Sequence, residues 1–150
     1  MKKIVLLFLT LICLISCQNS HDQTFVGTDI SSVPIDTTFR LKDFNGQIRT
    51  LEDFKGKVVV IFFGFTHCPD ICPTTLTDLK KTMALLKDKA SDVQVIFITL
   101  DPARDTEDVL KKFIPTFNSS FLGLTGSESD INKVISQFKI FYQKVNDGSK

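Results

Sequence analysis

Tryptophan is absent from this 150-residue chain and tyrosine occurs once, whereas phenylalanine occurs 14 times. We therefore expect a core filled by plain aromatic rings. The chain has only seven glycines and no glycine-rich phosphate loop, so nothing supports nucleotide chemistry. A formal charge of +1 leaves no basic surface for nucleic acid, and we expect no such partner. The length suits one folded domain.

The N-terminal segment is typical of export. Two lysines precede an apolar run, residues 4–15, that is too short to span a bilayer, which takes about 20 residues. The run leads into Leu-Ile-Ser-Cys17, which resembles a bacterial lipobox, where the cysteine becomes the first mature residue and carries lipid. We interpret residues 1–16 as a lipoprotein signal peptide and Cys17 as the lipidation site. An uncleaved anchor and an ordinary signal peptide are the alternatives, and all three place the domain outside the cytoplasm of a bacterium.

Only two cysteines remain for the folded part. Cys13 leaves with the signal and Cys17 is used for lipid, which leaves Cys68 and Cys72. A disulfide over so short a loop adds little stability through chain entropy, so we expect this pair to serve chemistry. Two close thiols form a redox couple or a ligand pair for a thiophilic metal. A pair without functional consequence is the plainer alternative.

The rest of the chain is predicted to be a polar tether, residues 17–34, followed by one α/β domain, residues 35–150. Alternating residues around Asn45-Gly46 predict a hairpin. Apolar runs predict strands at residues 57–65, 93–100, 121–124 and 140–145, the first of them a central strand buried on both faces. Helical spacing follows at residues 73–86, 109–117 and 127–138. This order implies a largely parallel sheet flanked by helices.

Both thiols follow one of these strands. Ligand sites in parallel sheets lie beyond the carboxyl ends of the strands, where Cys68 and Cys72 are expected. Asp101 follows the strand expected to be its neighbour. We therefore predict that the two loops face each other.

Two motifs carry a family resemblance. Cys-Pro-Asp-Ile-Cys-Pro at residues 68–73 and Thr-Leu-Asp-Pro-Ala-Arg-Asp-Thr at residues 99–106 resemble the Sco/SenC copper-binding proteins, over roughly residues 35–145. The resemblance implies a thioredoxin-like fold and membrane tethering outside the cytoplasm. It also implies copper delivery during assembly of the copper A centre of cytochrome c oxidase. The oxidase copper subunit is then the expected partner, with other copper or thiol-redox proteins beside it. The family's thiol ligands fall on Cys68 and Cys72.

The chain departs from this family near its end. The family's third ligand is a histidine in a later Asp-His-Ser-like segment, but this chain stops at Lys150 and no histidine follows His67. The resemblance places that ligand beyond Lys150, together with a terminal hairpin and helix. We interpret the sequence as a fragment, because a finished domain would not expose an open sheet edge.

The chemistry of the two thiols is compatible with the copper that the resemblance implies. Cu(I) is soft and accepts two thiolates in near-linear coordination. A helix N-terminus after the turn lowers thiol pKa and favours the thiolate. Cu(II) prefers an added imidazole, so the absent histidine should weaken Cu(II) binding most.

Other side chains are weaker candidates as ligands. His67 adjoins Cys68, but neighbouring side chains in extended backbone point apart, so we expect a supporting or surface role. His21 lies in the tether, and Met83 fits the core stripe of its helix. Asp70 lies between the thiols, where it tunes them, docks a partner or merely occupies the turn.

Three residues of the second motif form the other candidate group. They shape the rim of the site, or they belong to an ordinary loop and helix cap. They are Asp101, Arg104 and Asp105.

The enzyme alternative is thiol–disulfide exchange, in which Cys68 attacks and Cys72 resolves. Thioredoxin-type couples usually place two residues between the thiols, and the three found here argue against it. A thiol peroxidase is a third possibility with little specific support. A metallochaperone remains the favoured interpretation, and enzymatic activity stays open.

Overall fold

The computed structural model describes residues 27–142. The predicted signal segment, Cys17 and His21 lie outside these residues. The chain divides into two compact units, Met1–Pro34 and Ile35–Lys150. No helix in the described part is long and apolar enough to cross a membrane.

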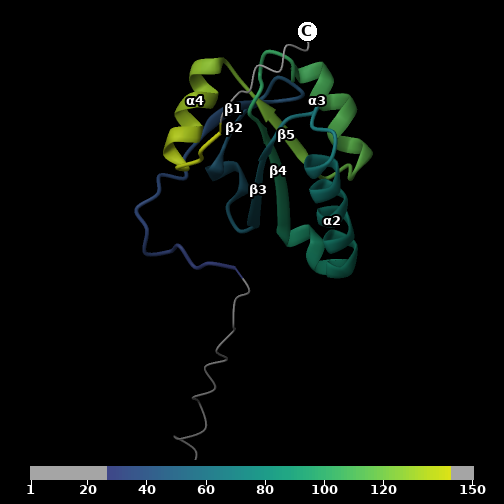
Figure 1. The fold of residues 1–150 in the computed structure, drawn as a ribbon. Helices are drawn as coiled ribbons and strands as arrows, with labels where there is room; N and C mark the ends of the chain where they lie inside the picture. Colours follow the sequence, from purple (N-terminus) through teal and green to yellow (C-terminus); the bar gives the residue numbers. More distant parts are fainter. Residues whose placement is uncertain (1–26, 143–150) are drawn as a thin grey trace, which may run out of the picture. The chain divides into compact units, whose positions relative to one another are not determined.

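The described part of the second unit alternates strands and helices, as predicted (Figure 1). The strands are β1 (Arg40–Asp43), β2 (Ile48–Thr50), β3 (Val58–Gly64), β4 (Val93–Thr99) and β5 (Leu122–Thr125). The α-helices are α2 (Ile71–Leu86), α3 (Glu107–Phe113) and α4 (Glu128–Gln137). Short 3₁₀ segments are η1 (Leu51–Phe54), η2 (Lys87–Asp92) and η3 (Ile114–Thr116).

The five strands form one mixed sheet in the order β2-β1-β5-β4-β3. The pairs β3–β4 and β4–β5 are parallel, whereas β1 is antiparallel to both β2 and β5. The carboxyl ends of β3, β4 and β5 therefore lie at the same end of the sheet. The β1–β2 hairpin lies beyond β5 in the strand order. Gly46 turns this hairpin at φ 78°, a conformation that favours glycine, which confirms the turn predicted at Asn45-Gly46.

In the part of the chain that the structure describes, β3 is not the central strand buried on both faces that the sequence predicted. Among the described residues β3 is the edge strand, and its side chains are mostly half-buried. Its neighbour β4 is the buried strand, with Val95 to Thr99 all nearly inaccessible. Both strands are rich in β-branched and aromatic residues, so composition alone did not distinguish them.

Helices cover both faces of the sheet, with α4 on one face and α2 and α3 on the other (Figure 1). Side chains of β4 alternate between the two cores because successive residues of a strand point to opposite faces. Ile96 and Ile98 pack beneath α4, and Val95 and Phe97 pack beneath α2 and α3. The expected aromatic core is present, with the Phe97 ring edge-on to its neighbours.

The last helix begins as predicted. The Ser127 hydroxyl accepts the N–H of Asp130, and the Asp130 carboxylate accepts the N–H of Ser127, which is a capping box. The strand predicted from Ile140 does not form at residues 140–142, and its remainder lies outside the described residues.

Candidate metal centre

The two thiols lie where β3 ends and α2 begins. β3 ends at Gly64, residues 65–70 form the connecting loop, and α2 starts at Ile71. Gly64 pairs with Thr99 in the parallel register, and its carbonyl accepts the N–H of Leu100 at 2.8 Å. The loops after β3 and β4 therefore meet, as the sequence predicted.

The Cys68 sulfur caps helix α2. It accepts the backbone N–H of Cys72 at 3.4 Å, whereas the N-cap residue Asp70 makes no side-chain cap. Burial opposes ionisation of this thiol. The N–H groups of Asp70, Cys72 and Ile71, together with the Cys72 side chain, outweigh burial and lower the pKa of Cys68 below its ordinary value of 9.0. Cys68 is therefore the more readily ionised thiol.

The Cys72 sulfur has the opposite environment. Cys72 is only 4% exposed, and burial raises the pKa of its thiol to about 11. The Phe65 N–H opposes this rise, while the Cys68 sulfur and the Asp105 carboxylate add to it. The pair thus combines a thiol whose pKa is lowered with a thiol whose pKa is raised, and the two side chains are in hydrogen-bonding contact.

Gly64 provides the space for the buried thiol. A Cβ at this position would lie 3.0 Å from Cys72 Sγ and 3.0 Å from the Phe97 ring. Such contacts are too close for a side chain to occupy without displacing its neighbours. Sequence reasoning missed Gly64, although a glycine closing an apolar strand just before a cysteine motif was a usable signal.

The arrangement fits a soft monovalent ion. Two free thiols, one half-buried and one buried, face one another. No cluster of three or more histidine, cysteine, aspartate or glutamate side chains suitable for a metal occurs in the described part of the chain. Two sulfurs suffice for near-linear Cu(I), whereas zinc and Cu(II) require further ligands.

The His67 side chain lies near the loop between β4 and α3. Its Nδ1 lies 3.2 Å from Thr66 Oγ1 and 3.8 Å from Asp105 Oδ1, and its side chain is largely exposed. This position agrees with the supporting or surface role expected from the sequence. Met83 packs in the core between α2 and the sheet, again as expected.

The second motif divides between rim and interior. Arg104 Nε donates to Asp101 Oδ2 at 2.5 Å, and the Arg104 side chain is exposed. Asp105 is completely buried and bonds to Thr66 and Thr99. Thr106, not Asp105, caps α3 by accepting the Val109 N–H. Sequence reasoning assigned no role to either bonded threonine.

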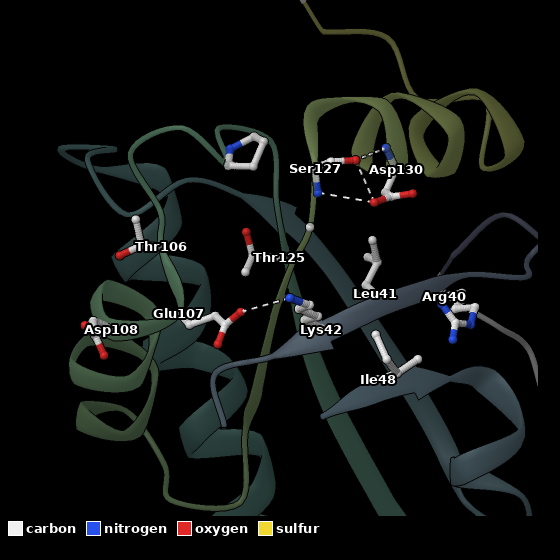
Figure 2. Close-up of a pocket in the computed structure, with 12 residues that line it drawn as sticks. Arg40, Leu41, Lys42, Ile48, Thr106, Glu107, Asp108, Thr125, Ser127 and Asp130 are labelled. Atoms are coloured by element: carbon white, nitrogen blue, oxygen red, sulfur yellow. Dashed lines mark hydrogen bonds and ion pairs between the residues drawn. The ribbon is translucent and has the colours of Figure 1, made fainter. Parts of the chain in front are cut away.

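A separate cavity of about 630 Å³ lies beside this loop, between the starts of α3 and α4 (Figure 2). Pro102 and Thr106 contribute to its lining, but neither cysteine does. Charges of both signs line it, including Lys42 and Glu107, which lie 3.9 Å apart. Both thiols therefore lie outside the lining of this cavity, Cys68 half-buried and Cys72 buried.

Known proteins resemble this chain across most of its length. Residues 28–150 match the family model SCO1/SenC. The SCO2-like protein of Rickettsia felis is 44% identical over 115 residues, which cover 77% of this chain and 56% of that protein. The chain therefore spans little more than half the length of this curated relative.

Solved structures share the fold. Bradyrhizobium japonicum ScoI, solved with copper bound, gives a TM-score of 0.72 at 39% identity, covering 77% of this chain and 74% of that one. BsSco, described as a Sco-family cytochrome c oxidase assembly protein with a disulfide switch, gives 0.62 at 30% identity, covering 75% and 68%. The predicted thioredoxin-like α/β fold is confirmed by these neighbours.

Proposed function

Since the chain belongs to the SCO1/SenC family, we propose that it is a membrane-tethered copper chaperone outside the cytoplasm. It binds Cu(I) through Cys68 and Cys72 and delivers it to the copper A centre of cytochrome c oxidase during assembly. One observation carries the proposal: Cys68 Sγ accepts the Cys72 N–H at 3.4 Å, which holds both sulfurs at the start of α2. Copper-bound ScoI and the oxidase-assembly role of BsSco support it.

The order in which the two thiols bind Cu(I) follows from their different pKa values. Cys68, with its lowered pKa, offers the first thiolate to Cu(I). Cys72 then loses its proton to solvent as its sulfur enters the coordination sphere. The helix N-terminus stabilises the negative charge that remains on the dithiolate complex.

Delivery needs an accessible ion and a surface for the partner. Cys68 is half-buried, at the surface of the loop. Ile71, between the two thiols, is 70% exposed and offers an apolar contact. A receiving protein that covers Ile71 brings its own ligands to the copper, so the ion passes directly between ligand sets.

The family resemblance expects a histidine as third ligand, and no histidine follows His67 in this sequence. An imidazole adds the nitrogen that Cu(II) prefers. The 150-residue chain on its own therefore favours Cu(I), and tight binding of Cu(II) to it would contradict this assignment.

Tethering rests on residues 1–16 as a signal peptide, on lipid at Cys17, and on residues 17–34 as the tether. Radiolabelled palmitate incorporated during expression in a bacterium should label the wild type and not Cys17→Ser. Equal labelling of both proteins would overturn the lipid anchor.

Copper binding is tested on the reduced chain under anaerobic conditions. We expect about one Cu(I) per chain, with loss of tight binding in Cys68→Ser and in Cys72→Ser. Cys17→Ser is the matched control, because it removes a thiol that the proposal does not use for copper. Full binding by either site variant would exclude the dithiolate site.

A second function is favoured by the asymmetry of the thiols. As an oxidoreductase, the Cys68 thiolate attacks a protein disulfide, forms a mixed disulfide and releases one partner thiolate. Deprotonated Cys72 then attacks Cys68, releases the second partner thiolate and leaves the Cys68–Cys72 disulfide. Catalytic reduction of insulin, with a mixed disulfide trapped by Cys72→Ala, would favour this function over copper delivery.

A further inference from the structure

A buried carboxylate joins the thiol loop to the sheet. Asp105 is 0% exposed, and its two oxygens accept three hydrogen bonds. Oδ2 accepts from Thr99 Oγ1 at 2.6 Å and from the Thr66 backbone N–H at 3.0 Å. Oδ1 accepts from Thr66 Oγ1 at 2.5 Å. These bonds satisfy a charge that would otherwise be costly to bury.

The bonds bridge segments that are far apart in sequence. Thr66 precedes Cys68 by two residues, whereas Thr99 closes β4 and Asp105 lies in the loop before α3. Cys72 is held independently, because it belongs to the first turn of α2 and its sulfur rests against Gly64. Asp105 therefore ties the loop that carries one thiol to the same sheet edge against which the other thiol is packed.

We propose that Asp105 is a positioning residue for the thiol pair. Its hydrogen bonds to Thr66 fix where the Cys68 sulfur lies relative to the Cys72 sulfur. The proposal rests on the proposed copper function, since the copper ion is the cargo that requires this spacing. Partners of metal ligands in other proteins alter metal affinity 10–100-fold when they are removed. Asp105 touches no cargo itself and acts through Thr66.

The chain contains a matched control. Asp43 is also 0% exposed and accepts two backbone N–H groups, from Asn45 at 2.8 Å and Gln47 at 3.0 Å, together with Arg49 Nε at 2.9 Å. These bonds hold the β1–β2 turn, away from the thiol loop. Asp43→Asn therefore reproduces the loss of a buried, hydrogen-bonded carboxylate without disturbing Thr66.

The test compares Asp105→Asn, Thr66→Val and Asp43→Asn in the full chain. An asparagine has one carbonyl oxygen and two N–H donors, so it cannot accept from all three groups now bonded to Asp105. Thr66→Val removes one hydroxyl and leaves the Asp105 charge in place. It therefore separates positioning from charge.

Two readouts are used, one of them free of copper. The first is the equilibrium of the Cys68–Cys72 disulfide with glutathione, which reports the effective concentration of one thiol at the other. The second is Cu(I) affinity by competition with bathocuproine disulfonate. We expect both quantities to fall about 10-fold or more in Asp105→Asn and Thr66→Val, and to stay within about twofold of wild type in Asp43→Asn.

The proposal is overturned if Asp105→Asn matches Asp43→Asn in both quantities at equal loss of stability. If Asp105→Asn does not fold, Thr66→Val and Thr99→Val carry the test, and wild-type values in both would overturn it. A wild-type chain that ignores Cu(I) would defeat the proposed function alone. The glutathione equilibrium would still decide whether Asp105 positions the thiols.

Discussion

The Cys72 sulfur lies against Gly64, where even a single added methyl group would be 3.0 Å from it. Gly64 is the last residue of β3, and Cys72 lies in the first turn of α2. The absence of a side chain on the strand therefore lets the helix bring its thiol down onto the sheet edge. This contact makes Cys72 the buried member of the pair, and the raised pKa of its thiol follows from that burial.

Gly64→Ala should disturb both stability and the site. The new methyl group displaces the Cys72 sulfur or the Phe97 ring, and overpacking of this kind costs about 1–3 kcal/mol. Gly123→Ala is the control, because its methyl group would lie 3.0 Å from Ile114 instead. Urea unfolding should show losses in both variants, and Cu(I) competition should show weaker binding only in Gly64→Ala. Unchanged affinity there would mean that the sulfur does not need this space.

The two thiols should become reactive toward alkylation in different pH ranges. Because the pKa of Cys68 is lowered and that of Cys72 is raised to about 11, Cys68 should be alkylated at a pH where Cys72 stays protected. Iodoacetamide labelling followed by peptide mass spectrometry, from pH 6 to pH 10, measures the order. Faster labelling of Cys72 at neutral pH would reverse the proposed roles of the two thiols.

Stability should fall in alkaline solution. A thiol with a raised folded-state pKa favours the folded state below its unfolded value, near 9.0, and loses that contribution as pH rises to about 11. The free energy of unfolding of the reduced chain should therefore decrease between about pH 9 and about pH 11. Cys72→Ser should lose less over the same range, since serine does not titrate there. If the free energy of unfolding, measured with urea, fell equally with pH in the two proteins, another group would be responsible.

His67→Ala should leave Cu(I) binding within about twofold of wild type. The imidazole Nδ1 lies near Thr66 and Asp105, and no cluster of three metal-binding side chains forms in the described residues. Bathocuproine competition measures the affinity, with Cys68→Ser as the variant that must lose it. A tenfold loss in His67→Ala would instead make this histidine a ligand of the 150-residue chain.

Much of the fold was accessible from local patterns. The hairpin at Asn45-Gly46 and the capping box at Ser127 formed as predicted, because a turn or a helix cap depends on a few consecutive residues. The position of β3 was not accessible in this way. Edge and buried strands share a composition here, and only the set of neighbouring strands distinguishes them.

The candidate site shows the same division. Cys68 and Cys72 were evident from spacing, because a strand, a short loop and a helix start bring two thiols together within one local segment. The role of Gly64 was not evident, and Asp105 was predicted to lie at the rim or in a helix cap, not in the interior. The role of Gly64 depends on where a helix packs, and that of Asp105 depends on a hydrogen bond to Thr66, 39 residues earlier.

The amino-acid order by itself determined which atoms are available for chemistry: two soft sulfurs following an apolar strand, at the start of a helix. Tertiary structure decided how they differ, since one thiol caps a helix while the other is packed against a glycine. The physical reason is the distance along the chain between the groups that interact. Spacing along the backbone sets which groups are near in the chain, whereas burial and the reach of a distant carboxylate arise only when β3 and β4 pair and bring their loops together.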